Sequence, residues 1–311
     1  MKMKKILVSI AALFAAAAML SAQNMSDATE TAKLANESLT AGNYETALAG
    51  FQEALKMAEA CGDDGLELVA TCKDIIPKTM NAIAKQMLQD NDLDGAIAKL
   101  GETIAVANEY GDEETAVKAQ TLIPQVYMKK GGALLNAKDF AAAADAYAKV
   151  LELDPANGIA ALRYGQCLEN SGKGDEALEA YKTAAANGQE KNANSQIGKF
   201  YLKRSVDALK AKKYADAVKD AQASYELINN PQALQIAGQA SQLAGKNNDA
   251  IKYFEQYLEA APTAKNAGQV AYTVGALYQQ AKNNAKAKEY FSKAVSDPKY
   301  GPDAQKALKA L

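Results

Sequence analysis

The chain contains no histidine and no tryptophan, and its cysteines number only three. Because histidine is the most common general base at neutral pH, its absence removes the usual means of activating a nucleophile or moving a proton. A zinc site is not predicted either, since zinc sites are built from histidines and closely spaced cysteines. These absences favour a non-catalytic protein, for which we expect no metal ion and no cofactor.

The cysteines are also too few and too far apart to form a disulfide framework. Cys61 and Cys72 lie on opposite sides of a turn at residues 62–65, so roughly 10 Å of helix separates Cys72 from the turn. Cys167 then has no nearby cysteine. We therefore expect all three to be buried, unpaired thiols, because free cysteine behaves as a small apolar side chain.

The chain lacks a surplus of charge of either sign. It has 35 Lys and Arg against 37 Asp and Glu, a formal charge of −2. Without a basic surplus, nucleic acid is not expected as a general partner. The 49% hydrophobic and 23% charged residues are instead typical of a folded globular protein.

Long apolar runs are absent except at the N-terminus. The lysines at residues 2–5 precede an apolar run at residues 6–20, which is short for a hydrocarbon core of about 30 Å. Ser21-Ala22 then provides small residues for cleavage, and Gln23 is not the cysteine that a lipid anchor needs. We predict that residues 1–22 are a signal peptide and that the protein is exported, periplasmic or secreted, with no lipid anchor and no transmembrane span after cleavage. An uncleaved N-terminal anchor is the alternative.

Proline is sparse as well, with seven in the chain, and nearly all of the sequence after residue 23 predicts helix. Glycine and asparagine recur at short intervals, where they favour the left-handed conformation that ends a helix. No stretch alternates β-branched and polar residues, so no strand is predicted.

Within these predicted helices, small and bulky residues recur in a fixed order. The predicted helices form pairs, and an alanine stands early in the second helix of each pair: Ala47, Ala96, Ala143, Ala177, Ala217, Ala250 and Ala287. Four residues later stands Phe51, Leu100, Tyr147, Tyr181, Ala221, Phe254 or Phe291. Residues four apart share one helix face, so each pair combines a close contact between helices with a side chain that fills a gap.

This pattern resembles the tetratricopeptide repeat, a helix–turn–helix unit of about 34 residues. Seven copies start near residues 28, 77, 124, 158, 198, 231 and 268. The resemblance implies an all-α, right-handed α-solenoid of about seven helix pairs over residues 23–299, closed by a capping helix at residues 300–311. The starts of repeats 1, 2 and 3 are farther apart than the 34 residues of the family unit. This spacing predicts extended helices or an extra turn in repeats 1 and 2. In repeat 5 the pattern is weakest, because Arg204 replaces a leucine and Ala221 an aromatic residue.

One stretch imitates a metal site. Residues 90–95, Asp-Asn-Asp-Leu-Asp-Gly, match the opening of a calcium loop. The glutamate that closes such a loop is missing, because Gly101 stands at its position and Glu102 comes one residue late. We therefore predict a solvated turn followed by a helix cap rather than a calcium site.

A candidate binding site follows from the resemblance, which implies that the first helices of the repeats line a concave groove. The residues that the family pattern places there in repeats 6 and 7 are Gln232, Gln235, Gln239, Gln242, Gln269, Tyr272 and Gln279. Upstream, Leu162 and Leu202 would form an apolar floor. Amides donate and accept hydrogen bonds at once, which suits an extended peptide or sugar hydroxyls. The alternative is that glutamine is present only as a soluble helix former.

The sequence thus predicts a non-catalytic adaptor or scaffold that binds a protein or peptide in a bacterial cell envelope. A glycan-binding accessory factor and a self-assembling structural scaffold, which would be a homo-oligomer, are the alternatives.

Overall fold

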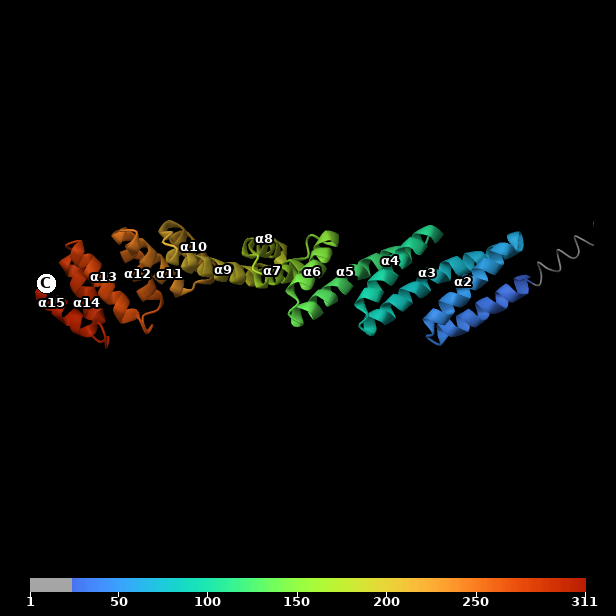
Figure 1. The fold of residues 1–311 in the computed structure, drawn as a ribbon, viewed down its shortest axis with the longest axis horizontal. Coiled ribbons are helices and arrows are strands. Elements are labelled where there is room, and N and C mark those ends of the chain that lie inside the picture. The colour runs from blue at the N-terminus through green and yellow to red at the C-terminus, as the bar shows by residue number, and fades with distance from the viewer. Residues whose placement is uncertain (1–23) are drawn as a thin grey trace, which may run out of the picture. The chain divides into compact units, whose positions relative to one another are not determined.

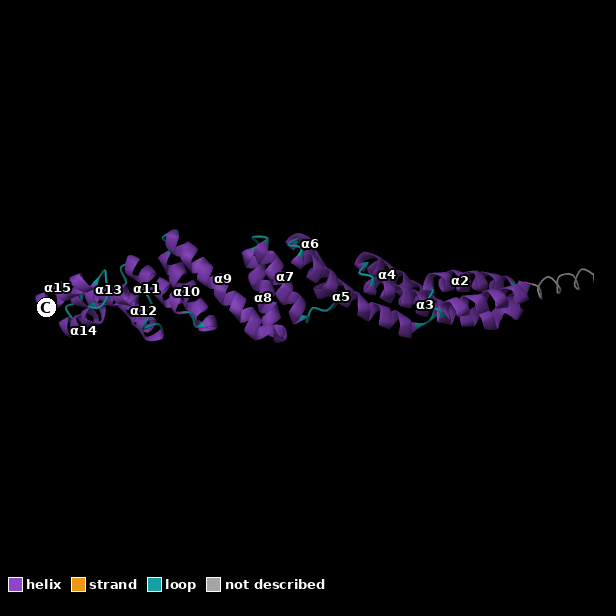
Figure 2. Cartoon of the chain, turned by 90° about the horizontal axis from the view of Figure 1, so that it is seen from below, coloured by secondary structure: helices purple, strands orange, loops and turns teal. Residues whose placement is uncertain are grey.

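The computed structural model describes residues 24–311, and every regular element in this range is helical (Figure 2). The predicted signal peptide, residues 1–22, lies outside the described residues. The chain divides into two compact units, which meet in sequence between Pro155 and Ala156 (Figure 1). Each unit is built from consecutive helices that pack in chain order, so the predicted all-α solenoid class is confirmed.

Unit 1 holds the first three helix pairs. Residues 24–40 form its first helix. The helices that follow are α2 (Tyr44–Ala60), α3 (Leu66–Gln89), α4 (Leu93–Tyr110), α5 (Glu113–Asn136) and α6 (Phe140–Leu153), with a 3₁₀ turn, η1 (Gly62–Gly65), before α3. From α2 onward each helix packs against the next. Two apolar clusters form the core, one around Phe51 and Ile76 and one around Leu100 and Val126.

Unit 2 holds the remaining pairs and the last helix. Its elements are α7 (Gly158–Asn170), α8 (Gly174–Ala184), η2 (Ala185–Gln189), α9 (Glu190–Lys210), α10 (Tyr214–Ile228), α11 (Pro231–Leu243), α12 (Asn247–Ala260), α13 (Ala267–Gln280), α14 (Asn284–Ala294) and α15 (Gly301–Ala310). A large core cluster joins α10 to α14, and a second one joins α13 and α14 to α15. The predicted capping helix therefore forms and packs through Ala304, which is fully buried.

The burial of the marker residues agrees with the repeat register in all seven pairs. The seven marker alanines are each 0% exposed, and the residue four places later is never more than 3% exposed. This includes repeat 5, where Ala217 and Ala221 are both fully buried. The positions expected to form close contacts between helices are therefore buried, which shows that the series of small and bulky residues in the sequence reflects helix packing.

The first helices of three repeats are longer than predicted. The helices α3 and α5 begin at Leu66 and Glu113, well before the predicted repeat starts at 77 and 124, and α9 begins at Glu190 rather than near 198. Pro77 and Pro124 consequently lie inside helices, although each removes a backbone donor. The extension that was expected in repeats 1 and 2 therefore lies largely at the beginning of the first helices of repeats 2 and 3.

Residues 90–95, which match the opening of a calcium loop in sequence, form a turn and a helix cap, as predicted. The Asp92 carboxylate accepts a hydrogen bond from the backbone N–H of Gly95 at 3.0 Å and begins α4, while Asn91 adopts φ +65°. Residues 24–311 contain no grouping of three or more Cys, Asp or Glu that could hold a metal ion. All three cysteines are buried, also as predicted, and burial raises the pKa of the Cys72 and Cys167 thiols.

Candidate functional site

The predicted amide face lies on α11 and is open to water. Gln232 and Gln242 are exposed, and Gln235 and Gln239 between them are half-buried. Their spacing places all four on one helix face, while the opposite face of α11 packs into the core. Among the hydrogen bonds of the described residues, none involves any of the four side-chain amides. Both polar atoms of each amide are thus available to a partner.

The helix α13 adds a different environment. Gln269 and Gln279 are exposed and also make no side-chain hydrogen bond within the described residues. Tyr272 is half-buried, and its ring centroid lies 5.4 Å from that of Phe291 and 5.6 Å from that of Tyr300. The ring therefore belongs to the packing of α13 on α14 and α15, which differs from the fully hydrated side chain expected of a groove residue.

Of the two leucines predicted to form an apolar floor, only Leu202 is accessible to a ligand. Leu162 is 8% exposed and therefore offers almost nothing to a ligand. Leu202 is half-buried and packs against the core cluster of α10–α14, and α9, which carries it, contacts α11 directly. The floor at α9 thus borders the amide face of α11, whereas Leu162 is a core residue. Family position alone did not distinguish the two, because burial depends on the neighbouring helix.

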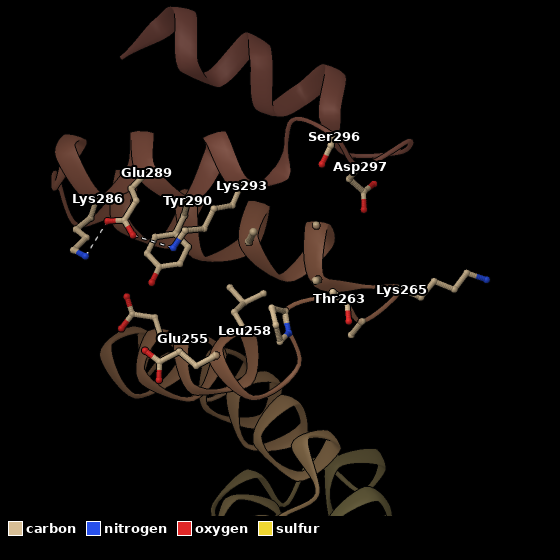
Figure 3. Close-up of a pocket in the computed structure, with 16 residues that line it drawn as sticks. Glu255, Leu258, Thr263, Lys265, Lys286, Glu289, Tyr290, Lys293, Ser296 and Asp297 are labelled. Carbon is tan, nitrogen blue, oxygen red and sulfur yellow. Dashed lines mark hydrogen bonds and ion pairs between the residues drawn. The ribbon is translucent and has the colours of Figure 1, made fainter.

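A second candidate site, which the sequence did not predict, is a cavity of about 660 Å³ bordered by α12, α13 and α14. Figure 3 shows Glu255 and Leu258 facing Glu289 and Tyr290 across it, with Thr263 and Lys265 on the loop before α13. Its floor consists of small residues of α13, Ala267, Gly268 and Ala271. Its volume is within the range of about 300–1,000 Å³ that ligand pockets occupy.

Four acidic and three basic residues line this cavity, and three of these seven are paired with one another. Glu289 accepts hydrogen bonds from both Lys286 and Lys293 at 2.9 Å, and these bonds hold its pKa below the ordinary value (Figure 3). Glu255 accepts a hydrogen bond from the Tyr278 hydroxyl at 2.7 Å. Burial, and then the hydrogen bond to Glu255, raise the pKa of Tyr278 to about 12. The cavity is therefore a neutralised polar recess without an activated nucleophile.

The sequence contained one weak signal of this cavity. Pro262 follows α12 directly and cannot donate the backbone hydrogen bond that would continue the helix, and Pro262, Thr263 and Lys265 of the loop before α13 line the cavity. The charged residues of α14 gave no signal of the cavity, because nothing in their spacing indicates that α12 lies opposite.

Family comparison identifies repeats in both units. The tetratricopeptide repeat family matches residues 114–192, and a second tetratricopeptide repeat model matches residues 231–263 and 268–296. The second model recovers repeats 6 and 7 at the starts found from the small and bulky residues. No curated protein sequence matches the chain.

Many solved structures are similar in fold. A crystal structure of MamA protein is 21% identical and covers 59% of this chain and 96% of its own, with a TM-score of 0.37. YrrB, described as a TPR protein with an unusual peptide-binding site, is 23% identical over 59% of this chain and 91% of its own, with a TM-score of 0.35. The TPR domain of P58(IPK) covers 91% of this chain and 97% of its own at 14% identity and a TM-score of 0.28.

Proposed function

The chain is a tetratricopeptide repeat protein, and from this we propose that it is an adaptor of the bacterial cell envelope that binds a protein or peptide through α11 and α13. Repeats of this family typically serve as non-catalytic scaffolds for protein interactions. No helix among residues 24–311 combines the length and the apolar composition needed to cross a membrane.

The observation that carries the proposed site is the row of unpaired amides on α11. Gln235 and Gln239 are half-buried and their amides make no hydrogen bond within the described residues, so a ligand can bind them without breaking an existing bond. An extended peptide presents alternating N–H and C=O groups, which one amide can satisfy together. The adjacent apolar residues of α9, including Leu202, would contribute non-directional burial beside these hydrogen bonds.

The site is tested by replacing Gln235 and Gln239 with alanine together. Each lost hydrogen bond is worth about 0.5–1.5 kcal/mol, so the double variant should bind roughly tenfold more weakly. Wild type and variant serve as baits in envelope extracts, and captured proteins are quantified by mass spectrometry. Tyr272 is left unchanged, because removing a ring that packs on Phe291 and Tyr300 would confuse binding with folding.

The matched control is Gln222→Ala with Gln256→Ala, on the second helices α10 and α12. It removes the same two chemical groups from the second helices of repeats 5 and 6. A protein that is depleted only with the Gln235/Gln239 variant supports the site. If both variants and wild type capture every protein equally, the amide face is not the binding surface.

The envelope location rests on the N-terminal segment, which lies outside the described residues. Its basic start, short apolar run and Ser21-Ala22 support export with cleavage. N-terminal sequencing of the protein purified from its native cell should begin at or near Gln23. Recovery of intact Met1 from a membrane fraction would instead support the uncleaved anchor.

A further inference from the structure

The two units carry opposite charge, although the whole chain is almost neutral. Residues 24–155 contain 22 Asp and Glu but only 11 Lys, a formal charge of −11. Residues 156–311 contain 15 Asp and Glu against 21 Lys and Arg, a formal charge of +6. Charges of opposite sign on two parts of one molecule attract the complementary parts of other copies and steer their encounter.

At the start of unit 1, this charge gathers on one face of the helix at residues 24–40. Asp27, Glu30, Leu34 and Glu37 recur at intervals of three and four residues, so they share a face. All four are exposed, with Leu34 at 54%, and only Glu30 has an ion-pair partner among the described residues, Lys33 at 3.8 Å. The face is therefore an acidic surface with an apolar centre.

The repeat register shows what this face is equivalent to. The positions of Glu30, Leu34 and Glu37 correspond in the later repeats to Ala233, Ala237 and Ala240 of α11 and to Val270, Val274 and Leu277 of α13. All six of those residues are at most 5% exposed, because a preceding helix pair packs on them. The acidic face thus has the geometry that accepts a neighbouring helix pair but carries charges suited to a basic neighbour.

The last helices of unit 2 are basic in turn. Residues 284–311 contain six lysines and three acidic residues. In α15, Ala304 faces the core while Lys306 and Lys309, three residues apart, are exposed and have no ion-pair partner among the described residues. Leu308 and Leu311 beside them are half-buried, so apolar surface accompanies the positive charge here as well.

We propose that copies of this chain associate head to tail, with the α15 face at Lys306 and Lys309 of one copy docking on the Asp27–Glu37 face of the next. The two surfaces are different, so a pair of copies keeps one acidic face and one basic face free, and the contact continues from copy to copy as a ring or an open series. This inference does not depend on the amide face of α11.

Salt dependence is the first test, by sedimentation of the purified full chain over a range of concentrations. The Debye length shrinks from about 30 Å at 0.01 M salt to about 3 Å at 1 M, so the average mass should grow with protein concentration only at low salt. A protein that stays monomeric at low salt at every concentration overturns the proposal.

Charge reversal is the decisive test. A tail variant, Lys306→Glu with Lys309→Glu, and a head variant, Asp27→Lys with Glu30→Lys and Glu37→Lys, should each associate at least tenfold more weakly than wild type. When the two variants are mixed, the reversed α15 face of the tail variant meets the reversed N-terminal face of the head variant, and the two unchanged faces also meet. Both contacts then join charges of opposite sign, so association should return. Rescue on mixing also shows that neither variant failed to fold.

The control is Lys191→Glu with Lys252→Glu, which changes the net charge of unit 2 by the same amount at exposed sites outside α15. This control should associate as wild type does. Equal loss in the control and the tail variant, or no rescue on mixing, would show that general charge rather than these two faces drives association, and the proposal would fail.

Discussion

At the residue scale, the most informative departure from the repeat pattern is Arg204. It stands where the family pattern has a leucine, and its guanidinium donates two hydrogen bonds of 2.6 Å to the carboxylate of Asp220 on α10. The group also lies 5.3 Å from the Phe200 ring and 5.0 Å from the Tyr201 ring. Repeat 5 has thus replaced an apolar helix contact with a bidentate ion pair, which is among the stronger polar contacts.

Arg204→Met should destabilise the protein, because it leaves the Asp220 carboxylate, whose side chain is 7% exposed, without its cation. Breaking a fully buried pair costs about 3–5 kcal/mol. The Arg204 side chain is 42% exposed, so we expect a smaller loss of about 1–3 kcal/mol. Urea unfolding measures it, with Arg163→Met as an exposed control near zero. If adding Asp220→Leu recovers no stability, the uncompensated carboxylate is not the cause.

Alkaline pH should weaken the fold through its buried tyrosines. Unfolded tyrosine ionises near pH 10, whereas burial and the hydrogen bond to Glu255 raise the pKa of Tyr278 to about 12. The folded state holds this proton more tightly, so its stabilisation is complete below about pH 10 and is lost as pH rises toward 12. Burial raises the pKa of Tyr181 and Tyr290 in the same direction. Urea midpoints measured across this window should fall less steeply in Tyr278→Phe than in wild type, and an unchanged slope would contradict the assignment.

At the scale of the helix pair, one contact recurs in four repeats. A glycine of the first helix faces an aromatic ring of the second, and a Cβ on that glycine would lie only 2.5–2.8 Å from ring atoms. The pairs are Gly131 with Tyr147, Gly165 with Tyr181, Gly238 with Phe254, and Gly275 with Phe291. The ring occupies the space of the missing side chain, which explains why small and bulky residues alternate between the two helices.

Gly238→Ala and Gly101→Ala should therefore have opposite effects on thermal unfolding. In α11 the added methyl group meets Phe254 and should cost about 1–3 kcal/mol despite the better helix propensity of alanine. In α4, Gly101 is exposed with nothing within 4 Å of a new Cβ, so alanine should stabilise by up to about 1 kcal/mol. A Gly238→Ala variant as stable as wild type or more stable would mean that the close contact in α11 is not real.

At the scale of the whole molecule, the chain consists of two compact units that each complete their own core clusters. The clusters of unit 1 are formed by the helix at residues 24–40 and α2–α5, and those of unit 2 by α9–α15. In a repeat protein, stability is approximately the sum of each repeat and its contacts with its neighbours. A cut between the units should consequently cost less than a cut within a repeat.

The fragments 24–155 and 156–311 should each be helical and unfold cooperatively when expressed separately. A fragment that starts at residue 211 should be markedly less stable, because it lacks α9, which packs on α10 over the buried Ala217 and Ala221. Circular dichroism with urea titration compares the three. If 156–311 is no more stable than 211–311, the division at Pro155 does not bound a folding unit.

The amino-acid sequence was sufficient to locate the repeats and the helix caps. These follow from residues three or four apart on one helix, or from a cap and its own first turn, so they are readable wherever short-range periodicity reflects packing. That is why Ala143, Asp92 and the amide face of α11 were located from the sequence, and why even the weak repeat 5 was placed in register.

Which of these residues remain at the surface, and which side chains they contact there, became known only from the folded structure. Leu162 is buried, Tyr272 packs on Tyr300, Arg204 finds Asp220, and a cavity opens between α12 and α14. Each of these facts depends on which helices lie side by side and on the length of the loop between them. Burial and pairing are properties of two distant segments together, and the periodicity of one segment carries no information about the other.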